Sequence, residues 1–358
     1  MKATQSLHDL GQSLWLDNIT RKLLNSGGLA HYINELSVTG LTSNPSIFDA
    51  AISKSADYDD EIGKLASSGQ SGEDLFFELA IQDLTRAADL FRPIYDRTAG
   101  VDGFVSLEVS PLLAYETAKT IAAAKHLHAK ANRKNLFIKI PGTPEGLPAI
   151  EEAIFAGVPI NVTLLFSTAQ YLASAEAYIA GLERRMSAGL PPDVRSVASI
   201  FVSRWDGATA DKLPPESRNK LGIAVSRQAY KAYRDLLDTD RWQRLQNFGA
   251  RPQRLLFAST STKDKAASDV LYIAALAAPN TVNTMPEATL LAYGEHGAPP
   301  VAIPRDGGDA EAVLAKLVSA GIDLTAVAAQ LQTDGAKGFV KSWTELMLAI
   351  DQKSKLLS

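Results

Sequence analysis

The sequence contains no cysteine, no long apolar run and no excess of one charge. Without cysteine the chain can form no disulfide, no cysteine nucleophile and no thiolate metal site, and it suits a reducing compartment. No run of about 18 apolar residues occurs, so we expect no membrane-spanning segment. The N-terminal segment also lacks the apolar core of a signal peptide, so we expect a cytoplasmic protein.

Charge and composition narrow the possible partners. The 36 basic and 40 acidic residues are intermixed, and the formal net charge is −4. We therefore expect no basic face for nucleic acid or for an anionic membrane. The apolar content of 46% is typical of a folded globular protein. No metal-ligand spacing, Gly-x-Gly-x-x-Gly turn or Walker-type loop is present, so we expect neither a metal nor an organic cofactor.

Short apolar runs alternate with longer helical patterns along the chain. The eight expected strands are residues 13–18, 38–44, 103–110, 136–141, 159–165, 197–204, 254–260 and 281–285. Such alternation favours βαβ units and a parallel sheet, and eight units close most economically into an α/β fold of the (β/α)8 TIM-barrel type. A doubly wound sheet is the alternative, but it lacks its glycine-rich turn.

The chain is about a hundred residues longer than a minimal barrel. We assign the surplus to a helical insertion after the second strand, residues 48–93, and to C-terminal helices in residues 307–358. No linker rich in proline, glycine or serine separates two halves. We therefore expect one domain over residues 1–358.

A single lysine lies in the middle of one apolar run. Residues 136–143 read Leu-Phe-Ile-Lys-Ile-Pro-Gly-Thr, which places Lys139 in a short buried strand before a Pro-Gly turn. Its methylene chain can carry the amine out to water, as in most strand lysines. Alternatively the amine stays inside, where burial favours the neutral form that attacks a carbonyl carbon. The neighbouring strands favour the second interpretation.

Polar residues alternate with apolar ones in those strands. Because side chains alternate across a strand, parity places the polar ones inside the barrel. This inward set is Asp17, Thr42, Asn44, Ser106, Glu108, Ser110, Asn161, Thr163 and Ser199. Unpaired buried carboxylates are costly, so these groups should be partners of one another. They fall toward the C-terminal strand ends, where barrel enzymes hold their active sites; a purely structural polar network is the alternative.

The residue types indicate imine chemistry. Lys139 is the candidate nucleophile that turns a ketone into a carbinolamine and then an imine. Asp17 can serve as the base during carbon–carbon cleavage, and Glu108 with Thr163 can hold and activate water. The candidate partners of substrate hydroxyls are Asn44, Asn161 and Ser199.

A phosphate pocket is expected after the sixth and seventh strands. Arg204 follows the sixth strand, and residues 258–263 read Ala-Ser-Thr-Ser-Thr-Lys. Barrel enzymes often bind phosphate in their late loops, and arginine offers bidentate hydrogen bonds to oxyanions. We therefore expect Arg204, Ser259 and Lys263 to bind phosphate. A surface arginine beside an ordinary helix cap would look the same.

Seven motifs along nearly the whole chain resemble the transaldolase family, in particular its longer bacterial branch. They lie at residues 39–48 (Thr-Gly-Leu-Thr-Ser-Asn-Pro-Ser-Ile-Phe), 105–109, 137–143, 160–167 (Ile-Asn-Val-Thr-Leu-Leu-Phe-Ser), 199–204, 256–260 and 281–287. The resemblance implies a barrel with its Schiff-base lysine on the fourth strand, at Lys139. It also implies transfer of a dihydroxyacetone unit from sedoheptulose 7-phosphate to glyceraldehyde 3-phosphate, which gives erythrose 4-phosphate and fructose 6-phosphate.

The same resemblance assigns roles residue by residue. Asp17 matches the acid/base aspartate, Glu108 and Thr163 match the pair that manages the catalytic water, and Arg204 matches a phosphate ligand. The matching polar contacts are Asn44, Asn161 and Ser199. The short branch has an arginine two residues after the seventh-strand serine, where this chain has Ser261, so we expect Lys263 to replace that charge.

Two other functions stay open at this stage. An aldolase could use the same imine but release free dihydroxyacetone, and a silent barrel could bind sugar phosphates without turnover. The silent barrel would be expected to lose Lys139, Asp17 or Glu108, and all three are present. We expect small sugar phosphates as partners, and a monomer or a homodimer.

Overall fold

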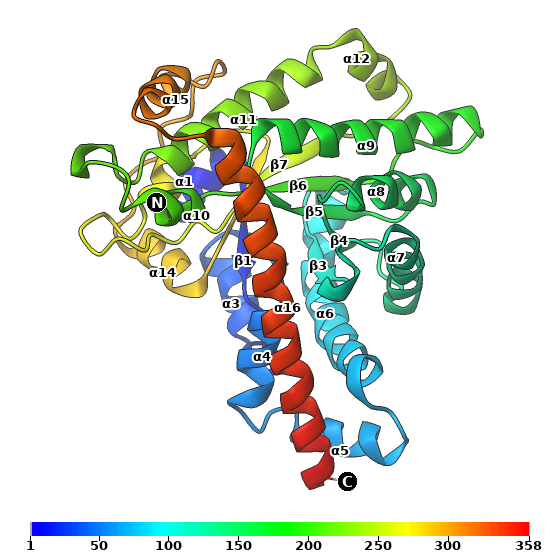
Figure 1. Ribbon diagram of the computed structural model, residues 1–358. Coiled ribbons are helices and arrows are strands. Elements are labelled where there is room, and N and C mark those ends of the chain that lie inside the picture. The colour runs from blue at the N-terminus through cyan, green and yellow to red at the C-terminus, as the bar shows by residue number, and fades with distance from the viewer. Residues whose placement is uncertain (1, 358) are drawn as a thin grey trace.

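Eight parallel strands form a barrel at the centre of the protein (Figure 1), which a computed structural model describes over residues 2–357. They are β1 (Gln12–Asp17), β2 (Val38–Thr42), β3 (Val105–Glu108), β4 (Leu136–Pro141), β5 (Ile160–Leu165), β6 (Ser196–Phe201), β7 (Gln253–Ala258) and β8 (Thr281–Met285). The strands pair in the order β2-β1-β8-β7-β6-β5-β4-β3. The expected (β/α)8 barrel is confirmed, and each strand overlaps its expected range.

The barrel closes where β2 meets β3. Leu41 N donates a hydrogen bond to Phe104 O at 2.9 Å, and Gly103 N donates to Thr39 O at 3.0 Å. Gly40 lies at this seam. A Cβ atom there would lie 2.6 Å from both Phe104 O and Trp15 Nε1, so a side chain at residue 40 would force the seam apart.

Helices follow the strands in the expected alternation. They are α1 (Ala3–Asp9), α2 (Arg21–Asn25), α3 (Gly28–Glu35), α7 (Thr117–Ala131), α8 (Gly146–Phe155), α9 (Thr168–Ser187), α10 (Ser203–Thr209), α11 (Leu221–Leu237), α12 (Asp240–Asn247), α13 (Leu271–Ala275) and α14 (Glu287–His296). Two of these helices, α7 and α11, are each preceded by a 3-10 turn that starts at a proline. These turns are η1 (Pro111–Leu113) and η2 (Pro215–Ser217).

The remaining helices occupy the two segments assigned to additions. The insertion after β2 forms α4 (Pro45–Ser53), α5 (Asp59–Ser67) and α6 (Gly72–Arg97), and the C-terminal segment forms α15 (Ala310–Ser319) and α16 (Leu324–Leu357). Figure 1 shows α16 passing across the barrel and then running alongside α4 toward α5. The two additions, far apart in sequence, therefore pack against each other.

Parity fails at Ser110, which was expected inside the barrel. β3 ends at Glu108, and Pro111 starts η1, so the alternation of a strand no longer applies at residue 110. Ser110 Oγ instead donates to Glu73 Oε1 of α6 at 2.9 Å. The prediction for this residue was wrong because proline ended the extended backbone earlier than the apolar pattern suggested.

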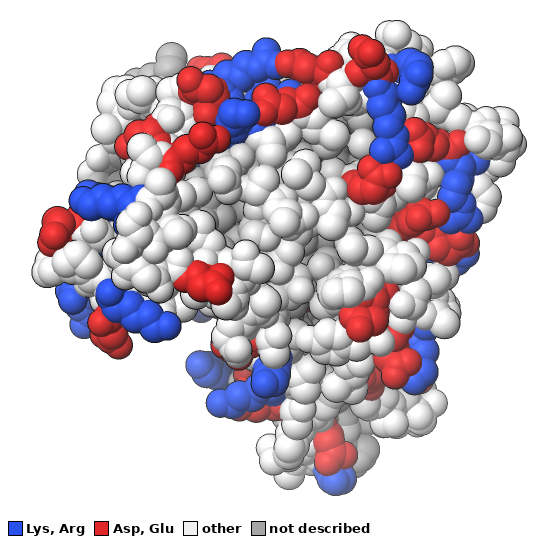
Figure 2. Space-filling view, turned by 45° about the horizontal axis from the view of Figure 1, so that its top comes forward, with Lys and Arg blue, Asp and Glu red and all other residues white. Residues whose placement is uncertain are grey.

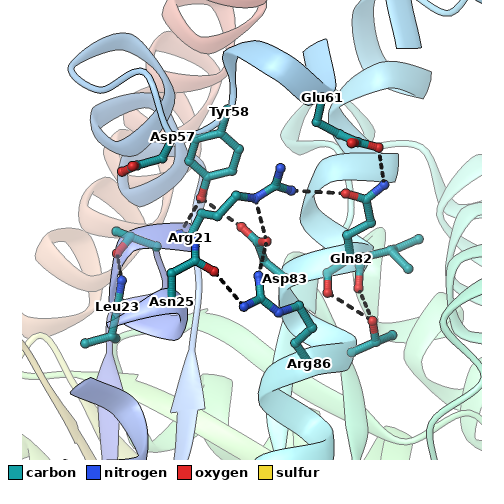
Figure 3. A network of polar contacts seen from close by, with 12 residues as sticks. Arg21, Leu23, Asn25, Asp57, Tyr58, Glu61, Gln82, Asp83 and Arg86 are labelled. Atoms are coloured by element: carbon teal, nitrogen blue, oxygen red, sulfur yellow. Dashed lines mark hydrogen bonds and ion pairs between the residues drawn. The ribbon is translucent and has the colours of Figure 1, made fainter. Parts of the chain in front are cut away.

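A buried polar network fastens the insertion to the first β-strand–helix unit (Figure 3). The Arg21 guanidinium of α2 contacts Asp83 Oδ1 of α6 at 3.1 Å and lies 4.6 Å from the ring centroid of Tyr58. Tyr58 OH donates to Asp83 Oδ2 at 2.8 Å. Burial raises the pKa of the fully buried Asp83 carboxyl, and the Arg21 charge and the Tyr58 hydrogen bond partly offset this. The network therefore joins α2, α6 and the turn before α5 through one buried carboxylate.

Charged side chains are intermixed on the face shown in Figure 2. Lysine, arginine, aspartate and glutamate alternate around its rim, and its centre is mostly uncharged. No single helix within residues 2–357 is long and apolar enough to cross a membrane. By length and composition only, α15 and α16 together meet that criterion, with a bend of 95° between them.

The Asp83 network gives a stability prediction. Asp83→Ala should lower the free energy of unfolding by about 3 to 5 kcal/mol, because it leaves the largely buried Arg21 guanidinium without its partner. The matched control is Asp89→Ala on the same helix, since Asp89 pairs with Arg133 but is 57% exposed. That variant should lose less than about 1 kcal/mol. Urea unfolding followed by circular dichroism measures both, and equal losses would contradict the role assigned to the network.

Candidate active site

The Lys139 amine lies inside the barrel. The side chain is only 5% exposed, and its Nζ lies 3.0 Å from Glu108 Oε2 and donates to Ser43 O at 3.2 Å. Lys139 and Glu108 are directly opposite each other in the β3–β4 register. The short strand β4, with apolar neighbours on both sides of Lys139, keeps the amine inside the barrel. Of the two interpretations of Lys139, the structure therefore has the buried amine and not the side chain that extends to solvent.

Asp17 ends β1 on the same side of the barrel. Thr42 Oγ1 donates to Asp17 Oδ1 at 2.7 Å, and the Thr42 and Thr284 hydroxyls are also 2.7 Å apart. Burial raises the pKa of the Asp17 carboxyl, while the Lys139 charge and the Thr42 hydrogen bond act against this shift. The carboxyl is therefore oriented by a hydroxyl and is easier to protonate than an ordinary aspartate.

Glu108 has the deeper of the two carboxyls. Burial raises the pKa of Glu108, the Lys139 charge opposes that shift, and nearby Asp17 adds to it. Glu108 Oε1 and Thr163 Oγ1 are both buried and have no hydrogen-bond partner within the described chain. Buried polar atoms are seldom left unpaired in folded proteins, so these two atoms are candidates to bind substrate or water.

Asn161 belongs to a polar chain across the barrel interior. Its Nδ2 donates to Ser106 Oγ at 3.1 Å, and its Oδ1 accepts from Ser199 Oγ at 2.7 Å. The side chain is fully buried and does not line the cavity described next. Ser199 does line it, so Asn161 reaches the cavity through the serine hydroxyl that it orients.

A cavity of about 280 Å³ opens at the C-terminal ends of the strands. Most of the residues singled out from the sequence line it: Asp17, Asn44, Lys139, Thr163, Ser199, Arg204, Ser259 and Lys263. Glu108 does not line it but contacts the Lys139 amine that does. With Thr284 of β8, which also lines it, side chains from seven strands or the segments just after them meet at this cavity.

Each end of the cavity has its own chemistry. Asn44 caps α4, because its Oδ1 accepts from Ile47 N at 3.2 Å, and this places the asparagine at the rim. Arg204 stands in the first turn of α10, and Ser259 Oγ lies 2.9 Å from Ser203 Oγ beside it. Lys263 and Ser261 complete this side. The lining holds three basic side chains and one carboxylate, so the cavity favours an anion.

Sequence reasoning missed the two aromatic residues that line the site, Phe201 of β6 and Phe339 of α16. Phe339 of α16 lines the cavity, and Lys139 Nζ lies 5.5 Å from the centroid of its ring. The helical spacing of α16 marks Phe339 as apolar and inward, but it does not say what the helix packs against. Within residues 2–357, no group of three or more His, Asp or Glu side chains is arranged to hold a metal ion.

The raised pKa of Asp17 gives a pH prediction for stability. The folded protein holds the Asp17 proton to higher pH than the unfolded chain, so the stability from Asp17 is present below about pH 3.8 and is lost as the pH rises through the folded pKa. The Asp17→Asn variant has no carboxyl at this position, so it does not lose this stability as the pH rises. The difference in Tm, variant minus parent, should therefore increase from about pH 4.5 to about pH 7 in calorimetry.

Asp89→Asn is the control with the opposite sign. A hydrogen bond from Arg133 lowers the pKa of Asp89, so the stability from this residue is lost as the pH falls. Its difference in Tm, variant minus parent, should decrease as the pH rises toward about 3.8 and then stay nearly constant from about pH 4.5 to about pH 7, because Asp89 is ionised in both the folded and the unfolded chain there. If the Asp17 variant followed the Asp89 variant, the electrostatic environment assigned to Asp17 would be wrong.

Comparison with known proteins agrees with this geometry. Residues 14–350 match the family model described as "Transaldolase/Fructose-6-phosphate aldolase". The chain is 45% identical over 356 residues to a "Transaldolase" of Saccharopolyspora erythraea, covering 98% of this chain and 97% of that protein. A "Transaldolase" of Parafrankia sp. is 44% identical, with 98% of each covered, and a "Transaldolase 2" of Streptomyces coelicolor is 42% identical, with 99% and 98% covered. The chain belongs to the transaldolase/fructose-6-phosphate aldolase family.

Proposed function

We propose that the chain acts as a transaldolase through an imine on Lys139. The chain is 42 to 45% identical, over nearly its whole length, to proteins named transaldolase, and this supports the enzyme class. The observation that carries the mechanism is the buried Lys139 amine, held 3.0 Å from Glu108 at the wall of an anion-favouring cavity. An amine in such a position can attack the keto carbon of a sugar phosphate.

Imine formation uses Lys139 and Glu108. The amine must first lose a proton, and Glu108 is the adjacent carboxylate that can accept it. The nitrogen then bonds to the keto carbon, and the carbinolamine loses its hydroxyl as water when a proton returns to that oxygen. A water molecule held between Glu108 Oε1 and Thr163 Oγ1 would relay this proton and would satisfy both unpaired atoms. The raised pKa of Glu108 suits a group that takes up and returns a proton.

Cleavage and transfer use Asp17. Its carboxylate takes the proton from the substrate hydroxyl on the second carbon from the imine carbon. The bond between that hydroxyl-bearing carbon and the carbon next to the imine then breaks. The departing aldehyde leaves, and the electron pair remains on the lysine-bound unit as an enamine. The enamine then bonds to the carbonyl carbon of an acceptor aldehyde, whose oxygen regains the proton from Asp17. Water hydrolyses the new imine and frees Lys139.

The basic side of the cavity suits the phosphate of the sugar. Arg204 in the first turn of α10, just after β6, and Lys263 in the segment after β7 supply positive charge to this part of the cavity. We therefore propose sedoheptulose 7-phosphate as donor and glyceraldehyde 3-phosphate as acceptor, with erythrose 4-phosphate and fructose 6-phosphate as products. Ser199 and Asn44 line the cavity and are proposed to bind the sugar hydroxyls. A cytoplasmic location, where sugar phosphates are metabolised, is part of this proposal.

Borohydride trapping tests the nucleophile. After incubation with fructose 6-phosphate and borohydride, the parent protein should gain the mass of one reduced dihydroxyacetone unit on the peptide that contains Lys139. Lys139→Ala should give no adduct and no turnover, because Lys139 is the amine that contacts Glu108 within residues 2–357. The control Lys125→Ala removes a surface lysine paired with Glu152 and should keep the adduct. A folded parent protein without an adduct would rule out the imine mechanism.

Kinetics of Arg204→Ala test the phosphate assignment. The variant should raise KM for fructose 6-phosphate by about tenfold or more, because a charge-assisted hydrogen bond to phosphate is lost. It should hardly change the rate with unphosphorylated dihydroxyacetone as donor. Arg133→Ala, which does not touch the cavity lining, is the control and should leave both unchanged. Equal losses on both donors would show that Arg204 supports the fold and not the phosphate.

A further inference from the structure

α16 carries one aromatic side chain into the catalytic cavity. Its buried residues recur at helical spacing and include Gly335, Phe339 and Trp343. Of these, Phe339 lines the cavity, with its ring centroid 5.5 Å from Lys139 Nζ. The ring is 8% exposed, so it is packed as part of the interior although it comes from the C-terminal addition.

The first half of α16 is fixed to the end of the barrel. Gln332 Nε2 donates to Gly142 O at 3.0 Å and to Leu164 O at 2.9 Å, which lie just after β4 and near the end of β5. Leu164 has a positive φ of 59° at an irregularity in the β5–β6 register. Gly335 packs on it so closely that a Cβ at residue 335 would lie 2.8 Å from Leu164 Cδ2.

The second half of α16 is fixed to the insertion. Trp343 Nε1 donates to Glu73 Oε1 at 3.1 Å, the same oxygen that accepts from Ser110. The Trp343 ring packs edge-on against Phe76 of α6, with centroids 5.0 Å apart. Further along, Lys353 donates to Ser55 O at 2.7 Å. Phe339 lies between these two sets of anchors, so its ring has a fixed position beside Lys139.

A fixed apolar ring beside Lys139 affects how the enamine on this residue reacts. The enamine on Lys139 has two fates, since its carbon can bond to an acceptor aldehyde or take a proton from water. The second fate forms a carbon–hydrogen bond, and hydrolysis of the resulting imine consumes one water and releases dihydroxyacetone and the free amine. An aromatic ring offers no acidic proton and occupies volume that water would otherwise fill.

We propose that Phe339 is a specificity-determining residue that directs the Lys139 enamine to acceptor aldehyde by keeping water from its α16 side. This inference rests on the proposed function, because it needs the lysine-bound intermediate. It goes beyond that function by assigning to the C-terminal helix, anchored by the insertion, control over transfer versus release.

The test compares Phe339→Ala and Phe339→Leu with Leu331→Ala. Leu331 is the matched control, a residue of the same helix that is 7% exposed and does not line the cavity. Each protein receives fructose 6-phosphate and erythrose 4-phosphate in D2O, and mass spectrometry follows sedoheptulose 7-phosphate and deuterium-labelled dihydroxyacetone. Phe339→Ala should raise the ratio of released to transferred product by about tenfold, Phe339→Leu should raise it less, and Leu331→Ala should leave it unchanged.

The outcomes separate this proposal from the one on which it rests. Absence of a borohydride adduct in the parent protein would overturn the imine mechanism. An adduct in all variants with an unchanged ratio of release to transfer would overturn only the role of Phe339, as would an equal rise in the Leu331 variant. Thermal melts check folding, and if Phe339→Ala does not fold, the ratio in Phe339→Leu decides between the same two outcomes.

Discussion

A charged amine buried inside a barrel requires a partner, and the arrangement of this site follows from that requirement. Lys139 stands opposite Glu108 in the β3–β4 register, and their ion pair is nearly inaccessible to solvent. Burying such a pair gains little stability over an apolar pair, because both ions lose their hydration. The burial instead keeps an amine and a carboxylate within proton-transfer distance at the wall of a cavity. Asp17, whose pKa is also raised by burial, adds the second carboxyl.

The need of a buried charge for a partner also shapes the insertion and the C-terminal helices around the barrel. Asp83 is a fully buried carboxylate that joins α2, α6 and the segment before α5 through Arg21 and Tyr58 (Figure 3). Glu73 joins α6 to α16 and to the turn after β3. Each acidic group accepts bonds from two different segments, so the insertion and the C-terminal helix form one scaffold. That scaffold positions Phe339 over the amine, which links distant parts of the chain to the reaction.

Much of the site could be predicted because strand parity is a local rule. In a barrel strand every second side chain faces inward. This rule indicated that Asp17, Glu108 and Thr163 share an interior, and these neighbours favoured an inward Lys139. Closure of the barrel then brings the C-terminal ends of all strands together. Asn161 shows the limit of this reasoning, since parity places it inside but does not say that Ser106 and Ser199 occupy its amide. Its role as a direct substrate ligand stays a prediction.

The sequence by itself determined the barrel, the inward set and the position of the lysine, because periodicity and turn residues act over a few neighbouring residues. It failed at Ser110, where Pro111 ended the extended backbone. Only the tertiary structure decided that Phe339 faces Lys139, two hundred positions earlier in the chain. That contact depends on the path of α16, and the path is set by close packing of Gly335 on Leu164 and by hydrogen bonds from Gln332 and Trp343. Contacts between distant segments leave no periodic trace in either segment, so they arise only when the chain folds.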